Sequence, residues 1–361
     1  MHLKKRTYFW IMIISVLALL ISACGGSQSS SQGGGQASGS PSGEGNGGGA
    51  ADFYKGKTVK LIVPHGAGGG FDTYARLTAP YLEKYLGATV VVENVTGAGG
   101  NIGRNQLWRA KKDGLSIGFT SFPSMVFSQL SGAEGIEYDV AGWEFLGRVV
   151  AESEVVSVPK GGKIQSLEEL MNAKGQVRIP LSGIGDDTFF KAMILGKALG
   201  IDLLPVTGYD GTSEAFAAAM RGDGEIVSSS IGSSAKLIES GDLKPILQMA
   251  LVPDSSLENV PLATDVIEDE TMRGFIQSIT NIAALDRSFF APPGIPEDRL
   301  QFLREAVSKT LQDPEFLKSA ESAGRLIDFM SAEEEEQLAE EALADAESLK
   351  PLLMEALEKA Q

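Results

Sequence analysis

Two glycine-rich turns contain the residues of this chain that are best suited to hold an anion. The first spans residues 64–72 and reads PHGAGGGFD, and the second spans residues 94–103 and reads NVTGAGGNIG. Each turn follows a β-branched run that predicts a strand and precedes an amphipathic segment that predicts a helix. At such a place the backbone can approach a ligand closely, and the free N–H groups and dipole of the helix favour a carboxylate or a phosphate.

The sequence offers little material for catalysis. Once an amino-terminal signal is removed, His65 is the only histidine and no cysteine is free, which leaves no zinc ligands and no Cys-His pair. Ile102 stands where a dinucleotide-binding turn needs glycine, and no glycine-rich loop continues into the Gly-Lys-Ser/Thr of a P-loop. Residues 228–232 lack the first glycine of a nucleophile elbow. We therefore expect no enzyme, no cofactor and no metal site.

We expect the ligand to contact the two turns and the segments that follow them. Neither turn contains lysine or arginine before Arg104, which is expected beyond the first turn of its helix, so main-chain N–H groups are predicted to hold the anion. The glycines could instead only make tight connections, and His65 could line the site or be an ordinary loop histidine. The site residues predicted in this half of the chain are His65, Gly66, Ala67, Gly68, Gly69, Gly70, Asp72, Thr96, Gly97, Ala98, Gly99, Gly100, Asn101 and Ser121.

An alternation of strands and helices positions these turns. The strands are predicted at residues 58–63, 89–93 and 115–120, and the helices at residues 72–87 and 101–110. Asp72 is expected to cap the first helix, and Pro80 is expected to kink or shorten it. This order is typical of a doubly wound α/β sheet.

A second α/β unit follows the apolar run 147–158 and repeats the order of strand, polar turn and helix. Polar turns at residues 182–187, 206–211 and 226–233 each follow a strand-like segment and should face the first two turns across a cleft. Asp186 and Asp187 could repel a second carboxylate, or bind an amine or hydroxyl group. The site residues predicted in this half are Ser182, Gly183, Gly185, Asp187 and Tyr209. The domains are predicted as 52–157, 158–280 and 281–361, the last returning to the first domain with carboxy-terminal helices.

The amino terminus predicts a lipoprotein. Positive residues 4–6 precede an apolar run that is too short to span a bilayer comfortably, and Ile21-Ser22-Ala23-Cys24 resembles a lipobox. Residues 1–23 are therefore predicted to be a signal peptide and Cys24 to be lipidated. Residues 24–51 form a Gly/Ser-rich linker with a reach of roughly 30 Å if it is a random coil. The protein would sit on the outer face of the cytoplasmic membrane, extracellular in a Gram-positive host and periplasmic otherwise.

The charge of the chain argues against nucleic acid as a partner. The formal net charge is −16, which would repel a phosphate backbone. Much of it comes from the acidic helical segment 331–361, where leucines interrupt the glutamates, so the acidity says little about the ligand.

At its turns the chain resembles the substrate-binding receptors of tripartite tricarboxylate transporters, the Bug or TctC family. The GGGFD of residues 68–72 is in register with the family's first turn, although His65 replaces an aromatic residue and Ala67 a proline. The second turn matches from 94 to 103 except that Thr96 replaces a proline. Weaker matches lie at Tyr138-Asp139, Trp143-Glu144-Phe145, Ser182-Gly183-x-Gly185, Tyr209-x-Gly211 and residues 291–296.

The resemblance implies a two-domain receptor of the type II periplasmic-binding-protein fold, a Venus flytrap. Such a receptor closes on a small mono-, di- or tricarboxylate, holds one carboxylate through backbone amides and waters of the first two loops, and presents it to a membrane permease. It also implies a monomer without a cofactor. The departures at His65 and Ala67 leave the identity of the acid open. Two alternatives use the same cleft, namely a hydrolase or transferase and a sensory or adhesive lipoprotein that signals to a partner protein.

Overall fold

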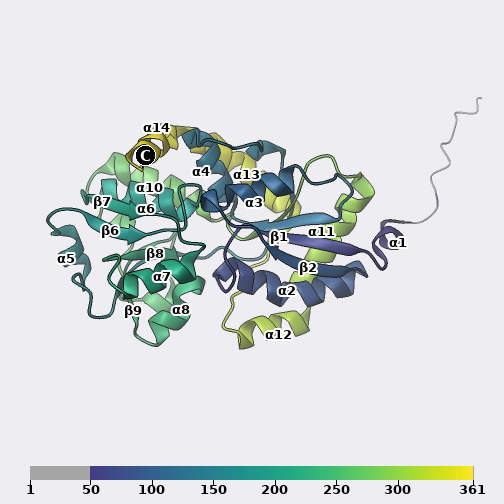
Figure 1. The fold of residues 1–361 in the computed structure, drawn as a ribbon, viewed down its shortest axis with the longest axis horizontal. Coiled ribbons are helices and arrows are strands. Elements are labelled where there is room, and N and C mark those ends of the chain that lie inside the picture. The colour runs from purple at the N-terminus through teal and green to yellow at the C-terminus, as the bar shows by residue number, and fades with distance from the viewer. Residues whose placement is uncertain (1–48, 361) are drawn as a thin grey trace, which may run out of the picture. The chain divides into compact units, whose positions relative to one another are not determined.

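Two lobes, each built on β-structure and covered by helices, make up the part of the protein that the computed structural model describes, residues 49–360 (Figure 1). The predicted signal peptide, Cys24 and the linker before residue 49 lie outside the described residues. The end of the predicted linker is not irregular, because helix α1 spans Ala50–Tyr54 and buries Tyr54.

The first lobe contains a five-stranded sheet in the order β2-β1-β3-β10-β4. Strands β1, β2 and β3 run parallel, as the alternation of strands and helices predicts, and β10 is antiparallel to both β3 and β4. Because β10 comes from late in the chain, the return of the chain completes this sheet. The strands are β1 Thr58–Val63, β2 Thr89–Asn94, β3 Ser116–Thr120, β4 Glu144–Arg148 and β10 Ser288–Ala291.

Helices flank this sheet and bury its apolar side chains. Helix α2 begins at Gly70 rather than at Asp72, and it continues through Pro80 to Leu86, so the proline does not shorten it. Tyr74 and Leu82 of α2 are fully buried against the sheet. The other helices of this lobe are α3 Asn101–Trp108, α4 Phe122–Ser131, α11 Glu297–Leu311 and α12 Pro314–Ser322.

The second lobe contains an antiparallel sheet, β8-β5-β9, beside the parallel pair β6-β7. The Glu225 N–H donates to the Arg178 carbonyl at 2.9 Å, which ties the start of β8 to β6. The strands are β5 Glu154–Pro159, β6 Val177–Pro180, β7 Leu203–Val206, β8 Val227–Ser230 and β9 Leu243–Met249. The helices are α5 Leu167–Met171, α6 Asp187–Ala198, α7 Thr212–Met220, α8 Ile231–Glu239 and α9 Ala263–Val266.

The chain crosses between the two sheets twice before its carboxy-terminal helices. It leaves the first sheet after Arg148 and has joined the second at Glu154, a few residues before the expected boundary at 157/158. The expected return boundary at 280/281 lies inside helix α10, Glu270–Ala283, and residues 284–287 lead from this helix into β10.

The carboxy-terminal helices reach both lobes. Helix α13, Ala332–Ala346, packs on β4 and α10, whereas α14, Lys350–Lys359, packs on α4 and α6. An ion pair of 2.7 Å between Lys359 and Asp202 fastens α14 to the second lobe. The return segment therefore does not lie on the first lobe alone, and in Figure 1 α14 lies over the second lobe.

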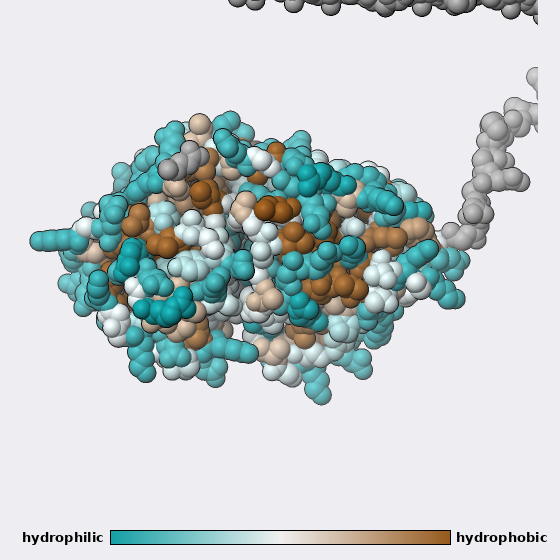
Figure 2. Space-filling view, in the orientation of Figure 1, coloured by the Kyte–Doolittle hydropathy of each residue, from teal (hydrophilic) through white to brown (hydrophobic). Residues whose placement is uncertain are grey.

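The surface seen in Figure 2 has hydrophobic side chains in separate patches among hydrophilic ones. Within residues 49–360, no helix has the length and apolar character needed to cross a membrane.

Candidate functional site

The glycine-rich turns of the first lobe touch polar turns of the second. A Cβ placed on Gly66 would lie 2.6 Å from the carbonyl oxygen of Asp210, and one placed on Gly99 would lie 2.3 Å from the nitrogen of Gly185. Gly99 also has a φ of 62°, in the left-handed region that favours glycine. Only glycine fits both requirements at residue 99, so the lobes are closed on each other at these turns.

Arg104 lies inside this contact rather than outside the site. Its side chain is fully buried, and Nη1 donates to the carbonyl oxygens of Gly99 at 3.1 Å and Gly185 at 3.0 Å. Nη1 also donates to Oδ1 of Asn101 at 3.0 Å, and Nε donates to Oγ1 of Thr120 at 3.2 Å. Arg104 is the fourth residue of α3, and its side chain lies beneath the glycines of the second turn, although it lines neither cavity described below.

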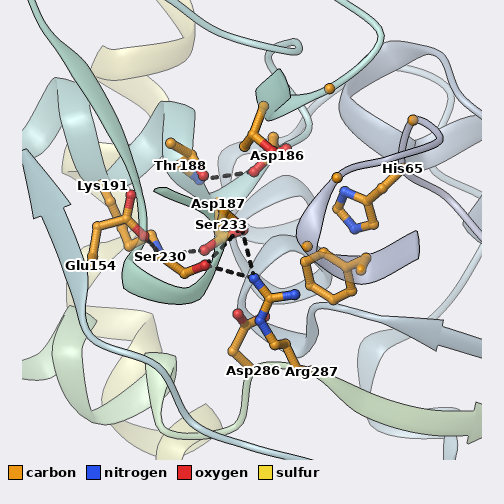
Figure 3. Close-up of a pocket in the computed structure, with 16 residues that line it drawn as sticks. His65, Glu154, Asp186, Asp187, Thr188, Lys191, Ser230, Ser233, Asp286 and Arg287 are labelled. Carbon is orange, nitrogen blue, oxygen red and sulfur yellow. Dashed lines mark hydrogen bonds and ion pairs between the residues drawn. The ribbon is translucent and has the colours of Figure 1, made fainter. Parts of the chain in front are cut away.

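A cavity lies between the lobes, open to solvent (Figure 3). Its walls come from the first glycine turn, from the second lobe and from the segment that leads into β10. The lining residues are His65, Gly66, Gly69, Gly70, Phe71, Glu154, Asp186, Asp187, Thr188, Lys191, Gly211, Thr212, Ser230, Ser233, Asp286 and Arg287.

Four helices, α2, α6, α7 and α8, begin at this cavity. Gly70, Asp187 and Thr212 line the cavity as the first residues of α2, α6 and α7, and Ser230 and Ser233 line it at the start of α8. No side chain among residues 49–360 caps the starts of α2, α7 or α8. The first N–H groups of a helix have no intrahelical acceptor and carry its positive dipole end, so this arrangement favours an anion.

Arg287 supplies a cation that the sequence analysis missed. Only 1% of its surface is exposed, and Nη2 donates to Oγ of Ser230 at 2.6 Å and of Ser233 at 3.1 Å. Its Nε pairs with Glu152 at 2.6 Å, and its guanidinium lies 4.4 Å from the centre of the Phe71 ring. The prediction that main-chain N–H groups hold the anion stays a prediction, and an arginine distant in sequence reaches the same cavity.

A second cation, Lys191, is held between two carboxylates. Its Nζ lies 2.6 Å from Glu154 and 2.5 Å from Asp187. Burial alone would lower the pKa of Lys191, but the charges of Asp187 and Glu154 raise it above its ordinary value. Burial alone would likewise raise the pKa of Asp187, but Lys191 holds it below the ordinary range. Lys191 is therefore charged and already paired with two carboxylates, so it is not free to bind an anion.

Two further carboxyl groups border the cavity without an ion-pair partner among residues 49–360. Burial, followed by the neighbouring charge of Asp187, raises the pKa of Asp186 to about 6 and that of Asp286 to about 7. Asp186 accepts from the Ser182 hydroxyl at 2.6 Å and from the Thr188 N–H at 3.0 Å.

His65 lies between the two lobes as an uncharged ring. Burial, and then the charge of Arg104, lowers its pKa well below the ordinary value. Its ring stacks on Phe71 with centroids 3.9 Å apart. His65 therefore offers an apolar face and a neutral nitrogen to the cavity at neutral pH.

The second glycine turn borders a different, adjoining cavity, which shares His65 and Asp186 with the first. Of the predicted site residues, the first cavity is lined by His65, Gly66, Gly69, Gly70 and Asp187. The adjoining one is lined by His65, Thr96, Gly97, Ala98, Gly99, Gly100, Ser182 and Tyr209. The two predicted turns therefore line two neighbouring cavities rather than one.

The remaining predicted residues line neither cavity. Asp72 instead shapes the first turn, since its carboxylate accepts from the Gly68 N–H at 2.8 Å and from Nδ2 of Asn94 at 2.9 Å. Ser121 caps α4 and donates to Asp187 across the lobes at 3.2 Å. The residues concerned are Ala67, Gly68, Asp72, Asn101, Ser121, Gly183 and Gly185.

The sequence model of the tripartite tricarboxylate transporter family receptor, TctC, matches residues 74–352. The chain belongs to this family. A TctC receptor binds a solute and is not an enzyme, so the family assignment confirms the expectation of a receptor with an extracytoplasmic place of work. One relative is the UPF0065 protein in the tcbD-tcbE intergenic region of a Pseudomonas species, 23% identical over 279 residues, which are 76% of this chain and 79% of the relative.

Solved structures agree with the TctC assignment. A periplasmic transporter protein is 25% identical with a TM-score of 0.69, and the match covers 82% of this chain and 97% of that one. MatC from Rhodopseudomonas palustris with bound malate is 20% identical with a TM-score of 0.69, and the match covers 81% of this chain and 99% of that one. These likenesses confirm the predicted two-domain periplasmic-binding-protein fold.

Proposed function

We propose that this protein is a lipid-anchored receptor that captures a small organic carboxylate between its lobes. It delivers that acid to the membrane subunits of a tripartite tricarboxylate-type transporter. Cys24 holds it to the outer face of the cytoplasmic membrane, and it works as a monomer.

The observation that carries this proposal is the convergence of the uncapped starts of α2, α7 and α8 and of Arg287 on one cavity between the lobes. Helix N-termini bind carboxylates through N–H groups, and a guanidinium adds a charge-assisted hydrogen bond. MatC, which has the same fold, has malate bound.

Closure of the lobes provides the signal for delivery. The turns of one lobe contact those of the other, and Arg104 bridges them through Gly185. Residues 149–153 and 284–287 join the two lobes and are the natural hinge. We expect a ligand to stabilise the closed form, which a permease can distinguish from the open one.

A binding screen tests the capture of a carboxylate. Thermal-shift measurements with mono-, di- and tricarboxylates should find at least one acid that raises the melting temperature, and calorimetry should then give its affinity. Arg287→Lys should weaken binding at least tenfold because lysine cannot donate in the same planar fork. Arg304→Lys is a matched control, because Arg304 lies on α11 and donates to Phe145 outside the cavity. No binding by any carboxylate, or equal binding by both variants, would refute capture at this cavity.

Mass spectrometry tests the anchor. Mature protein from the membrane fraction should begin at Cys24 and carry a diacylglycerol group, and Cys24→Ser should be released from the membrane. A mature protein that still begins at Met1 would remove the anchor from the proposal.

A further inference from the structure

Two consecutive buried residues of opposite charge line the cavity where the chain returns to the first lobe. Asp286 is 7% exposed and Arg287 is 1% exposed. In an extended chain, neighbouring side chains point to opposite sides. Here Arg287 has a φ of 55°, and the Asp286 N–H donates back to the Ala283 carbonyl at 3.1 Å. This break in the alternation lets both side chains reach the same cavity (Figure 3).

Each of the two residues carries a buried polar atom that has no hydrogen-bond partner among residues 49–360. These atoms are Oδ1 of Asp286 and Nη1 of Arg287. A Cβ on Gly70 would lie 2.9 Å from that Nη1, which places it at the start of α2. A buried polar atom without a partner costs about 1–3 kcal/mol, so a ligand group that reached these atoms from the cavity would be stabilised by them.

The charges of the cavity favour a ligand that brings a cation as well as an anion. Lys191 is matched by Asp187 and Glu154, and Arg287 by Glu152. Asp286 and Asp186 are left over, with no ion pair to any residue in the described part of the chain. A second carboxylate on the ligand would add to this negative excess, whereas an ammonium group would balance it.

We propose that the cavity takes an α-amino carboxylic acid, with its carboxylate against Arg287 and the start of α2 and its ammonium group against Asp286. The inference rests on the proposed function and names the ligand class within it. In such a ligand both charges are bonded to one carbon, and Asp286 and Arg287 line one cavity. Asp186 is less suitable for the amine because the protein already uses both of its oxygens.

One opposing arrangement has a different chemical signature. Because burial raises the pKa of Asp286 to about 7, a protonated Asp286 could donate to a carboxylate oxygen of a ligand without an amine. That ligand would bind more tightly as the pH falls. An ammonium group requires the ionised carboxylate, so an amino acid would bind more weakly as the pH falls.

Matched ligands on the unaltered protein test the proposal. Calorimetric titration at pH 8 with each standard amino acid and its desamino analogue, for example L-aspartate with succinate and L-alanine with propionate, measures what the amine adds. The tightest amino acid should bind at least tenfold more tightly than its analogue. Analogues that bind as tightly as every amino acid would overturn the inference and leave the proposed function intact. If neither class binds, both fail.

Two variants locate the effect. Asp286→Asn should lose the tenfold preference for the amino acid, while its affinity for the analogue stays the same or rises. Asp313→Asn is the matched control, because Asp313 is also buried but caps α12 away from the cavity, and it should keep the preference. If Asp286→Asn does not fold, the unaltered protein still decides, because the preference should shrink from pH 8 to pH 5. A preference that grows over this range overturns the proposal.

Discussion

Arg104 joins the two lobes, because its Nη1 donates to the carbonyl oxygen of Gly185 at 3.0 Å from beneath the second glycine turn. The same nitrogen also bonds to Gly99, so the shape of the turn and the closed position of the lobes depend on one side chain. Ligand affinity and stability are therefore coupled at this residue.

Arg104→Ala should lower both the stability and the affinity of the protein. Hydrogen bonds to charged groups contribute roughly 1.5–3 kcal/mol each, so we expect the free energy of unfolding to fall by about 3 kcal/mol or more. Denaturant unfolding and calorimetric titration measure the two effects. Arg109→Ala is the control, since Arg109 forms an exposed pair with Glu137 that should contribute less than about 1 kcal/mol. Equal losses in both variants would contradict this role.

Gly99→Ala should weaken ligand binding by obstructing closure. Its Cβ would lie 2.3 Å from the nitrogen of Gly185, so the lobes could not approach as they do here. Gly87→Ala is matched in strain, because Gly87 has a φ of 66° but no atom within 4 Å of the added Cβ. We expect affinity to fall at least tenfold for Gly99→Ala and to change less than twofold for Gly87→Ala. Equal affinities in a calorimetric titration would show that the contact at Gly99 does not control binding.

The two turns and their sheet could be predicted because their signals are local. Glycine runs directly after β-branched segments specify strand, turn and helix within a few residues, and β1 lies where the sequence places it. Arg287, Glu152 and Ser233 meet only in the folded chain, so no spacing reveals them. The one available sign was Asp286-Arg287 itself, a charged pair between the apolar residues Leu285 and Phe289.

The burial of Arg104 could not be predicted for the same reason. Its place one turn into α3 suggests an exposed side chain, yet the second lobe covers it by closing on the turn. Likewise, the acidic carboxy-terminal segment indicates a solvated helix, but its contacts with both lobes depend on how the lobes are arranged.

Lys191→Met should destabilise the protein strongly. It would leave Asp187 and Glu154 buried without their cation, and breaking a buried pair in this way typically costs about 3–5 kcal/mol. Lys197→Met removes a lysine from the same helix that pairs with Glu355 at the surface, and should cost less than about 1 kcal/mol. Chemical denaturation compares them, and a small effect of Lys191→Met would mean that the two carboxylates are not charged in the folded protein.

Glu335→Gln should stabilise the protein increasingly as the pH rises. Burial raises the pKa of Glu335 to about 8, although the Ser288 hydroxyl and Arg148 act in the opposite direction. A raised pKa means that the folded state holds the proton of Glu335 more tightly than the unfolded state does. The free energy of unfolding therefore falls as the pH rises from about 4.5 to about 8. Glutamine does not titrate, and its advantage at pH 8 should be on the order of a few kcal/mol. Melting temperatures of both proteins from pH 5 to pH 9 measure it, and a constant difference would exclude this titration.

The central claim is that a carboxylate binds between the lobes where helix starts and Arg287 converge. A crystal structure of the protein with the tightest acid from the binding screen tests it most directly. We predict a carboxylate oxygen within about 3.2 Å of Nη1 of Arg287 and of a main-chain N–H in the first turn of α2. A carboxylate bound elsewhere, or one in this cavity that contacts neither group, would contradict the account.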